Sequence, residues 1–306
     1  MEQRLTPAPA LTEAQKGVLY AISAHTVWAL MIVYLKLLHH IPALEGAVHR
    51  GLWAFPVAAL VAYLSGAFGE VAQVLRTPKK LAVLAFCAFL IAGNWALYIW
   101  AIGQGRVVET ALGYYINPLM NVLMGVAFLG ERLSPIKLIA LIIAAIGVIL
   151  QGLAVGAFPW VGLTLAASFC LYGFLRKQMA VTAVAGFFVE TLVLLGPALI
   201  YVGHGLFTGE SSFLQNTPDT LLLLGLGPFT ATPLLLYAAA VRRIWYSTAG
   251  IIQYLTPSLA VALAVFAYHE PMSAARLGSL AIIWVAIVMF SVASILEEKA
   301  RRGTLP

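Results

Sequence analysis

The sequence has few charged residues, and charge is the property that its composition most clearly lacks. Only 10% of its 306 residues are Asp, Glu, Lys or Arg, whereas soluble domains carry about 25%. The two cysteines, Cys87 and Cys170, lie inside apolar runs with no CxxC pattern and no histidine at ligand spacing. We therefore expect two buried thiols, rather than a disulfide framework, and no metal site.

Motifs of common enzymes are also missing. The chain has no HExxH pattern of metalloproteases, no GxSxG pattern of serine hydrolases and no GxxxxGKS or GxxxxGKT loop for a nucleotide phosphate. Asp219 is the sole aspartate, so a pair of catalytic aspartates is excluded. The sequence therefore predicts a protein that is not an enzyme and uses no cofactor, and it disfavours pumping driven by ATP.

Apolar residues are abundant instead: they make up 62% of the chain, and the mean hydropathy is +0.94. A helix needs about 20 apolar residues to cross the hydrocarbon core, where its backbone hydrogen bonds are satisfied internally. We therefore predict an all-α integral membrane protein. Its ten transmembrane helices are expected at 17–38, 42–64, 80–101, 107–129, 135–153, 159–177, 186–203, 219–240, 248–268 and 276–296.

Lys and Arg residues are unevenly distributed among the connecting segments. With the N-terminus in the cytoplasm, 14 of the 18 fall on the cytoplasmic side, three fall outside and Arg50 lies within the second span. The 14 are Arg4, Lys16, Arg76, Lys79, Lys80, Arg132, Lys137, Arg176, Lys177, Arg242, Arg243, Lys299, Arg301 and Arg302. Because cytoplasmic segments are rich in Lys and Arg, this bias predicts that both termini are cytoplasmic. The same bias accounts for the net charge of +6, because the basic residues set the orientation in the membrane. No nucleic-acid partner is therefore expected.

The two halves of the chain resemble each other. A shift of 139 positions aligns identical residues over three spans without a gap, whereas the first two spans need a shift of about 141–145. The aligned pairs include Tyr115 with Tyr254, Pro118 with Pro257, Glu131 with Glu270 and Ser134 with Ser273. Each half holds five spans, an odd number, so the second half enters the membrane from the opposite face. We predict two inverted five-helix repeats, at 17–153 and 159–296, an architecture of secondary transporters.

Motifs along most of the chain resemble those of a known family. They are Glu45 with His49-Arg50 and Trp53, Gly93-Asn94-Trp95, Leu97-Tyr98-Ile99-Trp100, Leu112-Gly113-Tyr114-Tyr115-Ile116-Asn117-Pro118-Leu119, Phe128-Leu129-Gly130-Glu131-Arg132-Leu133, Tyr172-Gly173 with Arg176-Lys177, Glu190-Thr191, Pro233-Leu234-Leu235, and Gln253-Tyr254 with Pro257. With these motifs the chain resembles the EamA-type drug/metabolite transporter superfamily and, within it, the RarD-like permeases. The first two spans depart from the family pattern, with Trp28-Ala29 and Ile32 where a Trp-Gly pair and a later proline are usual.

This resemblance implies the drug/metabolite transporter fold and a ten-helix carrier of the bacterial inner membrane, a class usually assigned to export. The implied partners are a small-molecule substrate, membrane lipid and, if transport is coupled, protons. The resemblance leaves open whether the carrier acts as a monomer or as a homodimer.

Three ionisable residues lie in the second span, namely Glu45, His49 and Arg50. Charged groups inside a bilayer are costly, so each is a candidate for substrate binding or coupling. Glu45 and His49 are four positions apart and share a face of the helix. Two interpretations stay open: the cluster binds a polar group of the substrate, with His49 as a proton relay, or it forms an internal ion pair that fixes the helix.

Glu190 is the deep carboxylate of the seventh span and follows Phe187, Phe188 and Val189. A carboxylate in an apolar environment needs a cationic partner or a proton. We consider two roles for Glu190: coupling or substrate contact, and a structural ion pair with Arg50.

A further set of polar and aromatic residues follows helical spacing in several spans. The candidates are Asn94, Trp95, Tyr98, Tyr114, Asn117, Asn121, Tyr172, Gln253 and Tyr254. Pro118 and Pro257 fall in mid-span, where proline permits a kink. The set either lines a central cavity for an amphipathic organic molecule or joins helices by hydrogen bonds.

These features together favour transport. A membrane-embedded enzyme would need a reactive constellation, and a receptor or scaffold would need long exposed loops. We therefore expect a secondary active or facilitated carrier that exports small organic metabolites or drugs by alternating access. An amino-acid exporter of the same fold, including one for aromatic amino acids, is the alternative.

Overall fold

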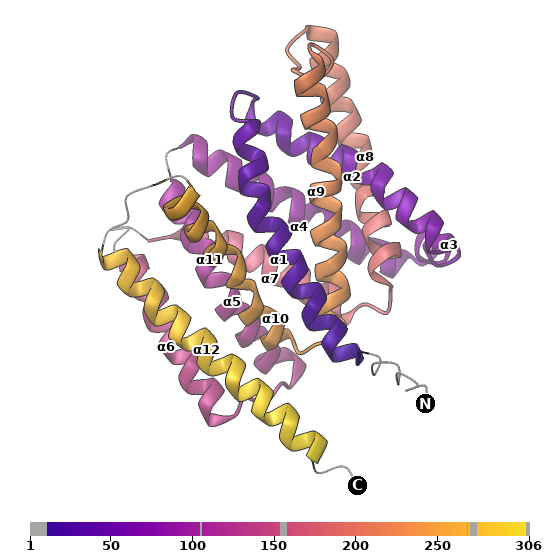
Figure 1. Ribbon diagram of the computed structural model, residues 1–306. Coiled ribbons are helices and arrows are strands. Elements are labelled where there is room, and N and C mark those ends of the chain that lie inside the picture. Colours follow the sequence, from indigo (N-terminus) through magenta and orange to yellow (C-terminus); the bar gives the residue numbers. More distant parts are fainter. Residues whose placement is uncertain (1–10, 105, 154–157, 268, 270–273, 304–306) are drawn as a thin grey trace, which may run out of the picture.

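The computed structural model of the protein describes residues 11–104, 106–153, 158–267, 269 and 274–303, and this part is helical without a β-strand (Figure 1). The helices are α1 Glu13–Leu37, α2 Ala43–Leu64, α3 Phe68–Leu75, α4 Pro78–Gly103, α5 Val107–Leu129, α6 Pro135–Leu153, α7 Trp160–Gln178, α8 Ala183–Thr208, α9 Thr217–Val241, α10 Tyr246–Gln253, α11 Leu255–Ala262, the π-helical turn η1 Leu263–Ala267 and α12 Ala274–Gly303. Each segment expected to span the membrane coincides with a helix; the bounds agree to within four residues, except that α8 and α12 run five and seven residues past their expected ends.

Nine helical stretches of the described chain are long and apolar enough to cross a membrane. The expected span at 159–177 corresponds to α7, which is not among the nine, because Arg176 and Lys177 in its last turn lower its mean hydropathy. Arg176 is nonetheless only 1% exposed, and α7 packs against α4 and α5. The protein interior therefore shields its charge, and the fold agrees with a bundle of ten spans.

α3 is a short helix that the sequence analysis did not predict. A left-handed turn at Gly66, with φ of +67°, separates it from α2. At eight residues it is too short to cross the bilayer. Val71 and Val74 bury one side of it, and the helix packs against α4 and α8.

The ninth span is interrupted rather than continuous. α10 ends at Gln253, α11 begins at Leu255, and Pro257 lies in the first turn of α11. Because proline has no backbone N–H, it cannot donate to the carbonyl of Gln253, and the break lies at this point. Pro118 lies inside α5, which is continuous, so the kink expected at Pro118 stays a prediction.

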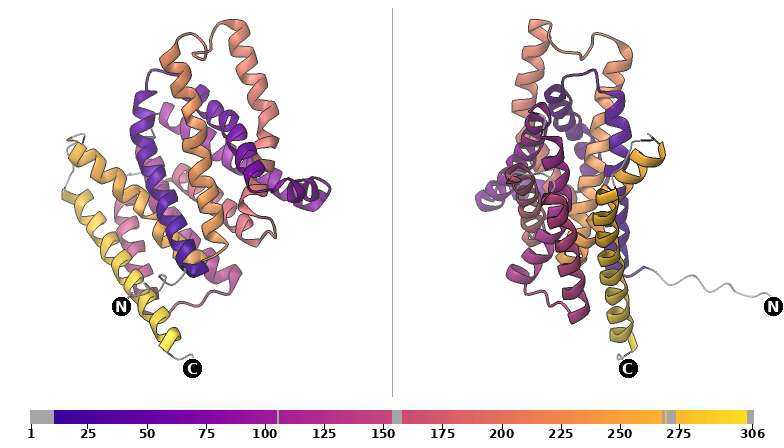
Figure 2. Two further views of the ribbon diagram at one scale, coloured as in Figure 1. Left: turned by 45° about the vertical axis from the view of Figure 1, so that its right-hand side comes forward. Right: turned by 90° about the vertical axis from the view of Figure 1, so that its left-hand side faces the viewer.

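The helices pack as two halves related by a pseudo-two-fold axis. The spans of the first half are α1, α2, α4, α5 and α6, and their counterparts in the second half are α7, α8, α9, α10–α11 and α12. The contact of α1 with α9 then corresponds to that of α7 with α4, and the contact of α2 with α9 to that of α8 with α4. The pairs α2–α8, α5–α10 and α6–α12 each consist of two counterparts. All these contacts are present, as two inverted repeats require. Figures 1 and 2 show α6 and α12 side by side at one edge of the bundle.

Two hydrogen bonds repeat this relation between single residues. Asn117 on α5 donates from Nδ2 to the Ala166 carbonyl on α7 at 2.7 Å, and Thr256 on α11 donates from Oγ1 to the His25 carbonyl on α1 at 3.0 Å. Thr256 lies 139 positions after Asn117, and Ala166 lies 141 positions after His25. Each half therefore uses an equivalent bond to hold its fourth span against the first span of the other half.

The start of α1 and the end of α12 lie at the same end of the bundle (Figure 1). We name this the cytoplasmic end, following the predicted orientation, and the opposite one the outer end; the orientation and the repeat bounds stay predictions. At the cytoplasmic end the buried carboxylate of Glu131 accepts hydrogen bonds from the backbone N–H groups of Tyr246 and Ser247, at the start of α10. Its counterpart in the repeat, Glu270, lies outside the described residues, as does Ser273.

Candidate functional site

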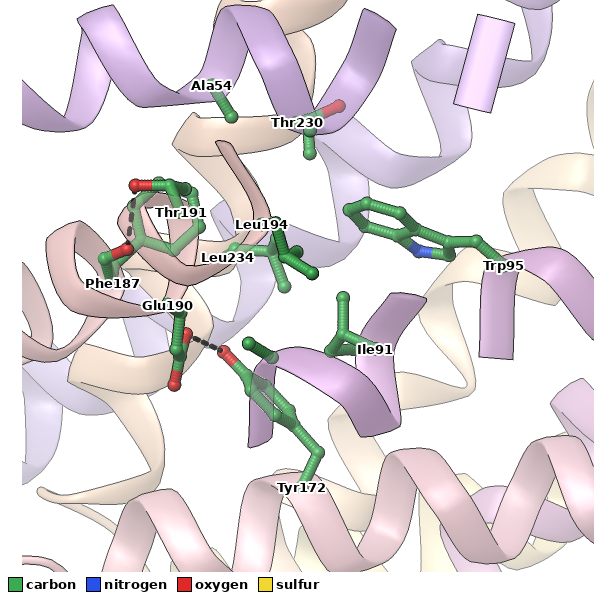
Figure 3. A pocket seen from close by; sticks show the side chains of 12 residues that line it. Ala54, Ile91, Trp95, Tyr172, Phe187, Glu190, Thr191, Leu194, Thr230 and Leu234 are labelled. Carbon is green, nitrogen blue, oxygen red and sulfur yellow. Dashed lines mark hydrogen bonds between the residues drawn. The ribbon is translucent and has the colours of Figure 1, made fainter. Parts of the chain in front are cut away.

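A small cavity lies in the centre of the bundle, between α2, α4, α7, α8 and α9 (Figure 3). Its volume of about 20 Å³ holds little more than one water molecule, and its walls are largely apolar. Ile91 and Thr230 both line it, as do Trp95 and Leu234, and the members of each pair are 139 positions apart. The cavity therefore lies where equivalent residues of the two halves meet, on the pseudo-two-fold axis.

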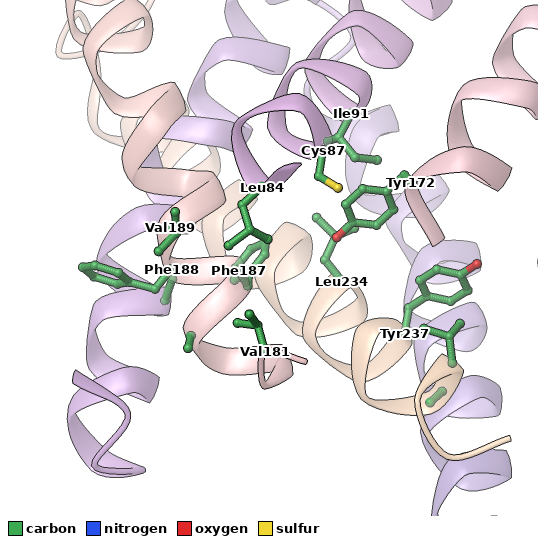
Figure 4. Packing of buried hydrophobic residues seen from close by; sticks show 14 of the residues in the cluster. Leu84, Cys87, Ile91, Tyr172, Val181, Phe187, Phe188, Val189, Leu234 and Tyr237 are labelled. Carbon is green, nitrogen blue, oxygen red and sulfur yellow. The ribbon is translucent and has the colours of Figure 1, made fainter. Parts of the chain in front are cut away.

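Buried apolar side chains close the cytoplasmic side of this cavity. Figure 4 shows Leu84 and Cys87 of α4, Phe187 and Val189 of α8 and Leu234 of α9 within one cluster. All five are buried. The cavity has room for water but not for an organic substrate. Passage of such a substrate therefore requires these helices to move apart.

Glu190 projects from α8 into the wall of the cavity and meets two residues of α7. The Tyr172 hydroxyl donates to its Oε2 at 3.3 Å (Figure 3), and Arg176 Nε lies 3.4 Å from its Oε1. Arg176 also donates from Nη2 to the Ala183 carbonyl at 3.1 Å. A Cβ at Gly186 would collide with the guanidinium, so a glycine is needed there to make room. The two opposite charges are thus buried together.

The pairing of Glu190 with Arg50 that the sequence analysis considered is wrong. Arg176 occupies the position of the cationic partner, because the last turn of α7 is turned into the bundle rather than toward solvent. Arg176 was predicted to be one of the cytoplasmic charges that set the orientation, and it was not predicted as a residue of the site. Its spacing of four from Tyr172, which puts both on one helical face, is the signal in the sequence that points to it.

Arg50 lies at the outer side of the cavity without a carboxylate within ion-pair distance among the described residues. Its Nε donates to Thr230 Oγ1 at 3.2 Å. Its guanidinium carbon lies 4.5 Å from the centre of a Trp95 ring, which is a cation–π contact. Tyr98 and Tyr114, whose ring centres are 6.2 Å apart, lie near it. Thr230, a polar residue of the cavity wall, was not predicted from the sequence.

Glu45 and His49 do not share this site. Glu45 Oε1 accepts a hydrogen bond from Ser211 Oγ at 2.7 Å and two more from backbone N–H groups of the α8–α9 connection. His49 Nδ1 accepts from Trp53 Nε1 at 2.8 Å, and its Nε2 lies 4.0 Å from Glu45 Oε1. The charges of α2 are therefore divided: Glu45 and His49 hold the outer connection, and Arg50 faces the cavity rim.

Most of the expected polar side chains bond one helix to another. The bonds are Asn94 Nδ2 to Leu165 O (2.9 Å), Asn117 Nδ2 to Ala166 O (2.7 Å), Asn121 Nδ2 to Gln253 Oε1 (2.7 Å) and Tyr254 Oη to Tyr115 O (3.2 Å). Of the residues expected to line a cavity, Trp95, Tyr172 and Glu190 do so. The helix-joining interpretation therefore describes the amides and Tyr254 in this conformation.

The described residues offer no group of three His, Cys, Asp or Glu side chains close enough to hold a metal ion. Cys87 and Cys170 are free and buried, which agrees with the expectation of two buried thiols. Among the described residues, the site brings together the Arg50 guanidinium, the Arg176–Glu190 ion pair and aromatic side chains, which are groups suited to binding a molecule.

Comparison with known proteins places this geometry in a family. Residues 15–153 match the EamA-like transporter family. An "Uncharacterized transporter" of Vibrio cholerae is 41% identical over 295 residues, covering 96% of this chain and 98% of the relative. "Protein RarD" of Salmonella typhi is 39% identical over 290 residues (94% and 99%), and "Protein RarD" of Escherichia coli K12 is 37% identical over 289 residues (94% and 97%). The chain belongs to the RarD-like EamA transporters.

The family assignment agrees with the fold. A solved crystal structure that is 21% identical in sequence superposes with a TM-score of 0.69, covering 90% of this chain and 97% of that chain. At this identity the likeness concerns the fold alone. Together with the apolar helices, the RarD-like relatives identify a multi-pass bacterial membrane transporter, as the resemblance in the sequence indicated.

Proposed function

We propose that the protein is a secondary carrier that exports small organic metabolites or drugs through the central cavity by alternating access. The observation that carries the proposal is the place of the cavity, whose walls contain equivalent residues of two inverted halves. When such halves exchange conformations, a site on their axis opens to each side in turn. The Vibrio cholerae relative is named a transporter, and the family model describes transporters, which supports transport.

A second opening lies at the cytoplasmic end. It is a cleft of about 520 Å³ between α1 and α9 on one side and α2 and α8 on the other. Tyr20, Val61, Val184, Ala239 and Arg242 are among the residues that line it. Such a cleft is a suitable entrance for a solute that leaves the cytoplasm.

Short segments of α8 and α9 separate the cleft from the cavity. Val184 and Leu235 line the cleft, whereas Phe187 and Leu234 line the cavity. The ion pair of Arg176 and Glu190 lies in the same layer of the bundle. We infer that this layer is the cytoplasmic gate, which opens when α8 and α9 move apart.

The carrier function is tested by transport itself. An untargeted comparison of metabolites retained by cells with and without the protein selects candidate solutes, and counterflow into proteoliposomes measures their exchange. We expect saturable exchange without ATP, which Trp95→Ala abolishes and Phe207→Ala leaves intact, because Phe207 is 92% exposed on α8. Absence of exchange for every selected solute would contradict the proposal.

Coupling to protons is a second part of the proposal. It rests on Glu190, a carboxylate in the cavity wall whose Oε1 has no hydrogen-bond partner among the described residues. If Glu190 carries the coupled proton, a pH gradient drives solute accumulation in proteoliposomes, and Glu190→Gln retains exchange but loses the response to the gradient. A solute flux that depends neither on pH nor on the pH gradient would contradict proton coupling, and the protein would then be a facilitated carrier.

A further inference from the structure

Arg50 differs in its partners from the buried arginine, Arg176. Arg176 faces the carboxylate of Glu190, whereas the Arg50 contacts in the described structure are the Thr230 hydroxyl and the Trp95 ring. Only Nε of Arg50 is engaged in a hydrogen bond, so both Nη groups keep their donors for another partner. A charge inside the bilayer is costly and is retained where function uses it.

Contacts from two helices already orient the Arg50 guanidinium. Arg50 is partly exposed, and Tyr114 beside it is 46% exposed. Thr230 fixes the guanidinium from α9 and Trp95 holds it from α4, and both of these residues line the central cavity. The free edge of the guanidinium therefore lies at the outer rim of the cavity, where a solute that passes through must come near it.

We propose that Arg50 binds the carboxylate of the transported solute, and that the substrates are small organic acids with an apolar or aromatic body. Two parallel N–H donors of arginine match the two oxygens of a carboxylate. Trp95, Tyr98 and Tyr114 supply aromatic surface beside that position for the remainder of the molecule. This inference rests on the proposed carrier function, since it names the substrate class of the same cavity.

Lipid phosphate is the other source of an anion in a membrane. Arg50 follows the first residue of α2 by seven positions, which at about 1.5 Å per residue places it about 10 Å from the outer end of the helix. Thr230 and Trp95, which hold the guanidinium, both line the central cavity, so a solute carboxylate is the partner that these contacts favour.

The test compares acids with their neutral amides. Purified protein in nanodiscs of a neutral phospholipid is titrated with 3-phenylpropionate and 3-phenylpropionamide, then with further acid–amide pairs of similar size, and binding is followed by tryptophan fluorescence. We expect at least one acid to bind at least tenfold more tightly than its amide. Arg50→Gln abolishes this preference. Arg50→Lys keeps the positive charge but lacks the two parallel N–H donors of the guanidinium, so it retains part of the preference.

Arg106→Gln is the matched control. Arg106 also lies over tryptophan rings, at 5.9 Å from Trp100 and 5.4 Å from Trp160, but it has a carboxylate partner in Glu109 at 3.5 Å. The acid preference should survive this substitution. Adding anionic phospholipid to the nanodiscs distinguishes the two anion sources, because competition by lipid alone would assign Arg50 to a headgroup and overturn the proposal.

The outcomes separate this inference from the carrier function. If the wild-type protein exchanges a solute and Arg50→Gln exchanges it equally well, the carrier function stands and the role of Arg50 is overturned. If acids bind through Arg50 but no solute is exchanged, the binding site stands and the carrier function fails. If acids and amides bind alike in every pair, or none binds, the carboxylate site is overturned.

Discussion

Arg176 shows how a single residue sets conditions on its neighbours. Its guanidinium occupies the space that a side chain at position 186 would fill, and its charge is balanced by Glu190 at 3.4 Å. A side chain at position 186 would leave the buried guanidinium without room, and loss of the Glu190 carboxylate would leave its charge without a partner. Both changes should lower the stability of the protein, which can be measured.

Gly186→Ala should destabilise the protein by about 1–3 kcal/mol, because the added methyl group collides with the Arg176 guanidinium. Gly196→Ala on the same helix is the control, since its added Cβ meets no atom within 4 Å and alanine favours the helix. Thermal unfolding in detergent measures both variants. Equal unfolding temperatures would show that α7 and α8 do not hold the guanidinium against Gly186.

Glu190→Gln should cost about 3–5 kcal/mol of stability, because it leaves the buried charge of Arg176 unpaired. Arg176→Gln combined with Glu190→Gln should recover part of that loss, since the unpaired charge is gone. Glu210→Gln, at an exposed position after α8, should change little. A single variant as stable as wild type would mean that Arg176 does not depend on this carboxylate.

Sequence patterns located the charged residues of the spans but not their partners. Glu190 was predicted as a buried carboxylate because it follows three apolar residues, and the structure buries it. Its partner was assigned to the wrong arginine because the choice depends on how α7 is rotated, which helical spacing alone does not determine. Hydrogen-bond acceptors on other helices, such as Thr230 for Arg50, are likewise set by tertiary packing.

Among the elements, α10 depends on a residue from outside its own sequence. Glu131, at the end of the α5 segment, accepts hydrogen bonds from the first backbone N–H groups of α10. These groups have no partner within the helix, and a negative charge near a helix N-terminus is favourable.

Glu131→Gln should therefore reduce the stability of the protein by about 1–2 kcal/mol, as loss of a helix cap does. The control is Glu13→Gln, because Glu13 is 63% exposed and its ion pairs lie at the surface, where such pairs contribute little. Chemical unfolding in detergent compares the two variants. A smaller effect at Glu131 than at Glu13 would contradict the capping role.

The helices themselves were largely predictable, and their interruptions were not. Runs of about 20 apolar residues predicted ten helices, and the structure contains them. α3 was missed because eight residues are too few to register as a span. The break at Tyr254 has a sequence signal in Pro257, but Pro118 occupies the equivalent place in an unbroken α5, so packing decides whether the break forms.

For the whole molecule, orientation is open to a direct test. Gln215 in the α8–α9 connection and Lys79 at the start of α4 are exposed at opposite ends of the predicted topology. A membrane-impermeant maleimide should label Gln215→Cys in intact cells and Lys79→Cys only after the membrane is opened. Both native cysteines are buried, so the wild-type protein gives the background. The reverse labelling pattern would place both termini outside.

The repeat was found from a few residues that are uncommon in apolar helices, and the packing agrees with it. Shifts of 139 and 141 positions connect the Asn117–Ala166 and Thr256–His25 bonds. No sequence shift shows which residues meet on the axis, because that depends on contacts between halves. The cavity and its wall, with Trp95 facing Leu234, therefore emerged only from the fold.

The ion pair of Arg176 and Glu190 exists in one half alone, and this has a consequence for the resting carrier. At a shift of 141 their counterparts are Leu35 and His49, which form no such pair. Two identical halves would make the inward-open and outward-open states equal in free energy. Under the proposed alternating access, an ion pair at one end only lowers the free energy of the state in which that end is closed, and a solute that enters there has to separate the pair.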